Sequence, residues 1–296
     1  MPSLGLGLGL HRGTAGFRGL LNAYPGSRAA LSLRALSSAW KGNDVILVRR
    51  SAAGGGDSEL GFTEADINNG VMLAWVKEHS ATADGLIAVW YDQSGNGNNL
   101  AQSTANAQPA IVRNGVKIAN GLDFDGTNDE LVFSGDGLDI FRNVDYGNVF
   151  SVTESDETGQ GVSRILDFAN NSSSARFLMG DSNSTDASFR IGGRRLDSDS
   201  FDSSTSSAVH GSDLKLVTGF LNWADSDAFL YQNGANVATD TSFQTDGSTS
   251  GTPSGSAGVG IGAYDGRIAE VIIYNTNQGA NRLGIEANMT KYYPIA

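Results

Sequence analysis

The sequence LKLVTGFLNWADSDAFLYQNG, residues 214–234, places two apolar runs on either side of a short polar segment. Phe229 and Tyr231 alternate with other residues in the second run, which is the two-residue period of a β-strand. Asp and Ser are typical turn residues, because their side chains bond to the nearby backbone. The stretch therefore predicts two strands joined by a turn.

The same pattern recurs between residues 86 and 275. Short apolar runs such as LIAVWYD, NVFSVTE and RIAEVIIYN are separated by Gly, Asn, Asp and Ser. Several runs are continuously apolar, as expected of central strands. More than about ten strands favour a large jelly roll over a small sandwich. The sequence thus predicts an all-β fold, a two-sheet antiparallel jelly-roll sandwich of the concanavalin A-like kind, with a few short helices.

Three segments show helical spacing. Residues 27–40 begin with Ser27, a plausible N-cap, and place Leu33 and Leu36 at helical spacing. Residues 64–78 place Ile67, Val71 and Trp75 on one face. Residues 281–293 begin at Asn281 and end before a proline, with Leu283, Ala287 and Thr290 on a shared face. The Asp/Ser-rich residues 197–213 and residues 239–256 are expected to be exposed loops.

Charge and composition exclude several functions. The chain has 20 basic and 32 acidic residues, a net charge of −12, and no cysteine. Such an acidic chain repels phosphate backbones and anionic lipid, so no nucleic-acid partner and no membrane insertion are expected. Because the chain has no cysteine, it cannot form disulfides, thiolate metal sites or cysteine nucleophiles.

Residues 1–28 are rich in glycine and precede the predicted sandwich domain, residues 29–296. Leucine alternates with glycine and basic residues follow the apolar run, which is the reverse of a signal peptide. The segment is either a frayed tail or an arm that docks on a neighbouring subunit. The side chains expected to dock are Leu4, Leu6, Leu8, Leu10 and Phe17.

The most distinctive string is WYDQSGNGNN, residues 90–99. Its polar groups lie close together, and its glycines permit a tight loop. They are either ligands for a sugar or Ca²⁺, or an Asx turn that bonds to itself. The candidate glycan-binding residues here are Trp90, Tyr91, Asp92, Gln93 and Asn96.

A second polar turn follows at residues 121–133, GLDFDGTNDELVF. Asp123, Asp125, Asn128 and Asp129 offer the oxygen ligands that Ca²⁺ prefers. Their spacing is like the start of an EF-hand, but the closing glutamate and the flanking helices are missing. Calcium is therefore the one cofactor considered, with a plain turn as the alternative.

The strings WYDQSGNGNNLAQSTANAQP, NGLDFDGTND and GRIAEVIIYN, with a terminal helix ending in KYYPI, resemble concanavalin A-like and laminin G-like jelly rolls of phage virion proteins. SLRALSSAWKGNDVILVRRS with the YDQSGNG string is similar to the catalytic domain of α-L-arabinofuranosidase B. That resemblance implies a glutamate nucleophile and a carboxylic acid. Arg176 or a neighbouring residue stands where the glutamate is expected, and Asp265 matches the acid. Residues 158–269 contain no glutamate, so we expect the catalytic pair to be lost and the chain not to be an enzyme.

The resemblance implies a virion structural protein, made in a host cytoplasm, that serves as a capsid decoration, an appendage or a tail-fibre component. Its partners would be other virion proteins bound through the arm, further copies of itself, and a host surface glycan at the 90–96 loop and Asp265. Two alternatives stay open. One is a glycan-binding host-attachment module, and the other is a glycoside hydrolase of the arabinofuranosidase type.

Overall fold

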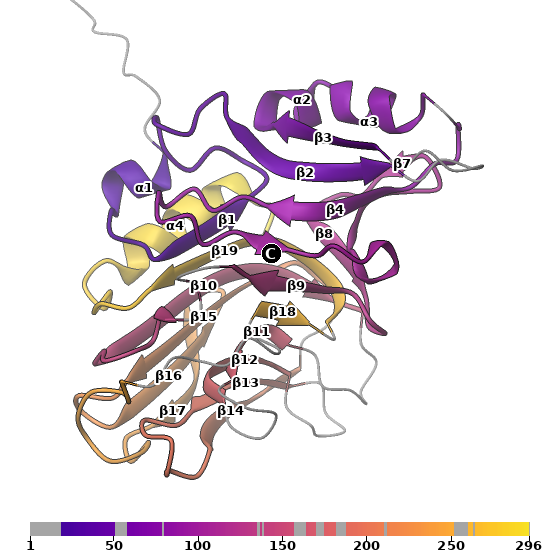
Figure 1. Ribbon diagram of the computed structural model, residues 1–296. Coiled ribbons are helices and arrows are strands. Elements are labelled where there is room, and N and C mark those ends of the chain that lie inside the picture. Colours follow the sequence, from indigo (N-terminus) through magenta and orange to yellow (C-terminus); the bar gives the residue numbers. More distant parts are fainter. Residues whose placement is uncertain are drawn as a thin grey trace, which may run out of the picture.

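The computed structural model describes residues 19–50, 58–78, 80–134, 137, 139–156, 164–169, 175–181, 188–209, 212–251, 260–262 and 264–295. These residues form an all-β sandwich of antiparallel strands with a few short helices (Figure 1). The fold class predicted from the sequence, a jelly-roll-like antiparallel sandwich, is confirmed. In this part of the chain no helix is both long enough and apolar enough to cross a bilayer.

The first sheet runs in the order β17–β16–β15–β10–β19. The other edge of β19 is shared, because β1 pairs with residues 270–273 and β8 with residues 265–268. The strands of this sheet are β1 (Ala29–Ser32), β8 (Leu122–Asp125), β10 (Tyr146–Ser155), β15 (Lys215–Asn222), β16 (Asp227–Gln232), β17 (Ala235–Asp240) and β19 (Asp265–Tyr274).

The second sheet begins β3–β2–β4 and continues through β5, β9, β18, β11, β12 and β13 to β14. β6 pairs with both β4 and β8 and so joins the two sheets. The strands are β2 (Asp44–Arg50), β3 (Ser58–Thr63), β4 (Gly85–Trp90), β5 (Leu100–Ala101), β6 (Ala110–Arg113), β7 (Val116–Lys117), β9 (Glu130–Phe133), β11 (Arg164–Ala169), β12 (Ala175–Asp181), β13 (Ser188–Gly193), β14 (Asp202–Val209) and β18 (Gly260–Gly262).

Two hydrophobic cores hold the sandwich together. The main core lies between the sheets and includes Trp90, Phe168 and Trp223. The second core covers part of the outer face of the first sheet, where Phe150 and Ile272 cluster with buried residues of α1 and α4. Figure 1 shows both helices beside this sheet. The helices are α1 (Leu20–Ala23), α2 (Glu64–Asn68), α3 (Val71–Val76), α4 (Arg282–Tyr292) and the 3₁₀ helix η1 (Ala105–Ala107).

The helix predicted at residues 27–40 is wrong. Its first half is strand β1, whose residues pair with β19 from Ala29↔Ile273 to Ser32↔Glu270. All four residues of β1 are buried, since β19 pairs with one of its edges and both its faces are covered. Long-range pairing therefore overrides the local helical spacing.

The predicted helix at 64–78 is interrupted. α2 ends at Asn68 and α3 begins at Val71, because Gly70 adopts a left-handed conformation with φ 79°. Val71, predicted to lie on the shared face, is 51% exposed. The buried side chains of α3 are instead Met72 and Val76.

The closing helix exists, but its buried face differs from the predicted one. Leu283 is 67% exposed, whereas Ile285 and Met289 are buried in the second core. Asn281 lies at the N-cap position without a capping bond from its side chain.

One predicted loop is also corrected. Residues 202–209, within the segment expected to be an exposed loop, form strand β14, which pairs with β13. Serine and threonine are abundant there, and the pairing with β13 supplies the backbone bonds that their local chemistry does not favour.

Candidate functional site

The 90–99 loop holds β1 in place through hydrogen bonds of its buried side chains. Asp92 is 1% exposed, and its carboxylate accepts from the backbone N–H of Ala30 at 2.8 Å, of Ser94 at 2.9 Å and of Asn98 at 2.9 Å. Gln93 is 3% exposed and donates to the carbonyls of Ser32 and Arg34. These bonds hold β1 and the segment after it in place.

The candidate glycan-binding residues of this loop differ in their exposure to solvent. Trp90 is completely buried in the main core, and Asp92 and Gln93 have no surface to offer a sugar. Asn96 is exposed, but its amide donates to the carbonyl of Ser27 at 2.9 Å. Tyr91 remains partly exposed. The self-bonded turn is the interpretation that the geometry supports.

The turn at residues 121–133 uses its aspartates internally. Burial raises the pKa of Asp125, but the backbone N–H groups of Thr127 and Asn128 outweigh this and lower it. Burial and the nearby Asp125 raise the pKa of Asp129 to about 6. The amide of Asn128 donates to the carbonyl of Asn106.

Asp123 is also engaged, because it pairs with Arg113 at 3.0 Å. In the described ranges, no group of three or more His, Cys, Asp or Glu side chains could hold a metal ion. The geometry of this turn thus gives the calcium site no support, and that site stays a prediction from the sequence.

The two positions matched to catalytic carboxylates lie in different surroundings. Arg176 is fully buried on β12, and its Nη2 lies 2.5 Å from Asp197 Oδ1. Asp265 is half-buried at the start of β19, opposite Asp125 on β8. Burial and the charge of Asp156 raise the pKa of Asp265.

The predicted docking residues of the arm, Leu4, Leu6, Leu8, Leu10 and Phe17, lie outside the described residues. Residues 19–28, which the sequence assigned to the arm, pack on the sandwich. Leu20 and Leu21 are buried in the second core, and the Leu21 N–H donates to the carbonyl of Leu36. The docking role of the arm stays a prediction.

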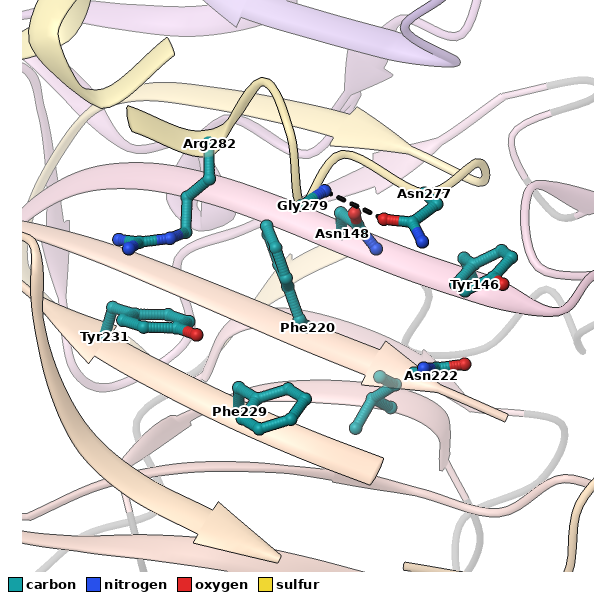
Figure 2. A pocket seen from close by; sticks show the side chains of 10 residues that line it. Tyr146, Asn148, Phe220, Asn222, Phe229, Tyr231, Asn277, Gly279 and Arg282 are labelled. Atoms are coloured by element: carbon teal, nitrogen blue, oxygen red, sulfur yellow. Dashed lines mark hydrogen bonds between the residues drawn. The ribbon is translucent and has the colours of Figure 1, made fainter. Parts of the chain in front are cut away.

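A groove of about 350 Å³ opens on the outer face of the first sheet, beside the start of α4 (Figure 2). The strand register builds it. Asn148 on β10 lies opposite Phe220 on β15, which lies opposite Phe229 on β16. In the neighbouring rows, Asn222 is paired with Tyr146, and Tyr231 with Thr218. The alternation of each strand therefore brings these side chains to one face.

Aromatic rings form the floor of the groove. Phe220 packs edge-on against Phe150 in the second core, with ring centroids 5.7 Å apart. It also packs edge-on against Tyr231 at 6.0 Å. Phe229 and Tyr146 are partly exposed on either side. The floor is thus anchored in a core while its upper surface reaches solvent.

Asparagines and one arginine form the rim. Asn277 lies on the loop between β19 and α4, and Asn222 ends β15. Arg282, the first residue of α4, lies over the ring of Tyr231 at 3.9 Å. Its Nη1 donates to Glu286 Oε2 at 2.8 Å, so its charge is compensated within the helix. No aspartate or glutamate is among the residues that line this groove.

The sequence contains one sign of this groove, the alternation of residues 228–231. Phe229 and Tyr231 face outward, while Ala228 and Leu230 face the main core. An alternation in which both faces are apolar indicates a strand covered on both sides or one with an aromatic surface. Arg282 and Asn277 carried no sequence signal, because only the chain fold brings them to β10 and β16.

No protein-family model matches the chain, and no curated protein sequence matches it. The solved structures with a similar shape include the CBM40 module of a Ruminococcus gnavus sialidase bound to sialyllactose. It is 14% identical with a TM-score of 0.36, and the match covers 49% of this chain and 83% of that one.

Two enzymes are also similar in shape. A Trypanosoma rangeli sialidase is 16% identical with a TM-score of 0.45, over 68% of this chain and 31% of that one. A GH54 α-L-arabinofuranosidase is 15% identical with a TM-score of 0.47, over 88% of this chain and 62% of that one. The match thus spans less than two thirds of either enzyme chain.

Proposed function

We propose that the chain is a carbohydrate-binding β-sandwich that holds a saccharide in the groove over β10, β15 and β16 without hydrolysing it. The observation that carries this proposal is the lining of the groove, where aromatic rings lie beside asparagine amides. Sugars present apolar C–H faces and many hydroxyls. A pocket with aromatic walls and a few placed polar groups suits both.

Binding without hydrolysis follows from the same lining. Retaining hydrolysis requires two carboxyl groups about 5 Å apart across the scissile bond. The groove is lined by none, and its nearest charged pair, Arg282 with Glu286, is bonded within α4. A saccharide in this groove would meet hydrogen-bond donors and rings but no nucleophile.

The experiment is a glycan array followed by calorimetric titration of the best saccharide, with two tyrosine variants compared. Tyr231→Ala removes a ring from the floor and should weaken binding at least about fivefold, since stacked aromatic contacts contribute about 1 kcal/mol or more. Tyr91→Ala is the matched control, because Tyr91 is also partly exposed but belongs to the 90–99 loop. It should bind as the unmodified chain does.

Two results would reject the proposal. One is an array on which no saccharide binds. The other is a saccharide whose binding is lost with Tyr91→Ala and kept with Tyr231→Ala. That result would place the binding site at the 90–99 loop, as the sequence predicted.

The sequence also led us to expect a structural role in a virion, and this role is compatible with the proposal. In a virion component that contacts host glycans, the groove would supply the glycan contact and residues 1–18 the attachment to the particle. A chain without residues 1–18 should then keep its saccharide affinity and lose its place in the particle. Electron microscopy and composition of the purified particles would measure the second effect.

A further inference from the structure

The orientation of Asn148 is set by one backbone donor. Asn148 is 2% exposed, and its Oδ1 accepts from the N–H of Gln278 at 2.8 Å. A backbone N–H can only donate, so the oxygen of the amide must face it and the NH₂ group must point away. Figure 2 shows the Asn148 nitrogen directed toward the rings of the groove. None of the described residues accepts a hydrogen bond from it.

Asn277 is oriented in the same way. Its Oδ1 accepts from the N–H of Gly279 at 2.8 Å, and its NH₂ group points toward the groove (Figure 2). Arg282 adds further donors, because its hydrogen bonds to Gly234 and Glu286 both use Nη1. Across the described part of the chain, its Nε and Nη2 have no acceptor. The NH₂ groups of Asn148 and Asn277 and the guanidinium of Arg282 therefore offer hydrogen-bond donors to a ligand.

The charges around the groove favour an uncharged hydrogen-bond acceptor on the ligand. The guanidinium of Arg282 is bonded to Glu286, whose side chain is 5% exposed. Asp225, bonded to Asn222 at the other end of the groove, adds a negative charge. In a chain of net charge −12, a ligand carboxylate would gain no net attraction here. A neutral carbonyl oxygen accepts the same donors without that repulsion.

The ring of Phe220 lies between Asn148 and Tyr231 (Figure 2). It is 8% exposed and gives the groove an apolar surface next to the Asn148 amide. An acetamido group matches this arrangement, since it joins a carbonyl acceptor to a methyl group. The hydroxyls of Tyr146 and Tyr231, which can donate and accept, suit the ring hydroxyls of a sugar.

We infer that the groove selects neutral saccharides that carry an N-acetyl group, whose carbonyl accepts from Asn148 and Asn277 and whose methyl packs on Phe220. This inference rests on the proposed function. It names the class of saccharide that the same site takes.

The test uses an array of neutral saccharides in matched pairs, with and without the N-acetyl group, on the full chain. N-acetylated members should bind at least about tenfold more tightly than their partners, as expected when a missing acceptor leaves placed donors unpaired. Asn148→Asp and Asn277→Asp keep the oxygen that accepts from the backbone and replace the donor by a second acceptor. Each should abolish the preference for the N-acetylated member.

Asn106→Asp is the control for added charge, because Asn106 is exposed on η1, far along the chain from the groove. It should retain the preference. Asn277 is exposed, so its variant gives a result even if the buried Asn148→Asp fails to fold.

The outcomes separate the two claims. Groove binding that is lost with Tyr231→Ala but is equal for both members of each pair overturns the N-acetyl inference and leaves the proposed function standing. An array with no bound saccharide overturns both.

Discussion

Arg34 and Glu270 form an ion pair with two parallel hydrogen bonds inside the protein. Nε of Arg34 donates to Oε2 at 2.8 Å and Nη2 donates to Oε1 at 2.9 Å. Glu270 is fully buried on β19, and it also accepts from Ser32 Oγ and Tyr293 Oη. The pair therefore joins the segment after β1 to β19 and to the end of α4.

We expect Glu270→Gln to lower the free energy of unfolding by about 3–5 kcal/mol, because it leaves the guanidinium of Arg34 buried without its charge partner. Urea denaturation followed by fluorescence would measure this. Glu59→Gln breaks the more exposed pair with Arg49, 2.6 Å long, and should cost less than about 1 kcal/mol. Equal losses in the two variants would contradict the special role of the buried pair.

Asp92→Asn should destabilise the chain without changing its saccharide affinity. The substitution removes the oxygen that accepts from Ser94 Oγ at 2.7 Å and from the N–H of Asn98 at 2.9 Å. Hydrogen bonds to a charged acceptor contribute about 1.5–3 kcal/mol, so a loss of that size is expected on urea unfolding. Weaker binding by the folded variant would instead indicate that the 90–99 loop contacts the ligand.

Asp129 should make stability fall as the pH rises. Burial raises its pKa in the folded protein to about 6, above the ordinary value of 3.8. The folded state thus binds the proton more tightly than the unfolded state. The associated stability is complete below about pH 4 and is lost as the pH rises through 6.

Asp129→Asn removes this penalty and should stabilise the chain by about 1–3 kcal/mol at pH 7–8, with little effect near pH 4. Melting temperatures between pH 4 and 8 would show a flatter profile than that of the unmodified chain. Asp246→Asn, at an exposed position, serves as the control. A variant that loses stability at pH 8 would show that the Asp129 charge is needed by Arg113, which lies 3.5 Å away.

Saccharide binding in the groove should depend little on salt. The Arg282 charge is compensated by Glu286 at 2.8 Å, and the expected ligand is neutral. Raising the ionic strength from about 0.05 to 1 M screens exposed charges strongly, yet we expect less than about a twofold change in affinity. A steep loss of affinity with salt would indicate an anionic ligand held by Arg282.

The sequence predicted the strands better than it predicted the site. Polar turns between short apolar runs placed most strands correctly, because strand formation and turn chemistry are both local. The helix expected at 27–40 was wrong, since β1 is held by pairing with β19, more than 200 residues away along the chain. The 90–99 loop was correctly singled out as unusual. Its polar groups turn inward because they satisfy backbone donors of β1.

The sequence by itself determined the all-β class and the acidic charge. Tertiary structure decided which face of β15 and β16 remains open to solvent. Alternation divides the residues of a strand between two faces, but it does not say which face another element will cover. α4 covers one part of the outer face and leaves the rings of Phe229 and Tyr231 partly open. Asn148 and Gln278 are 130 residues apart, so the bond that orients the Asn148 amide exists only in the folded chain.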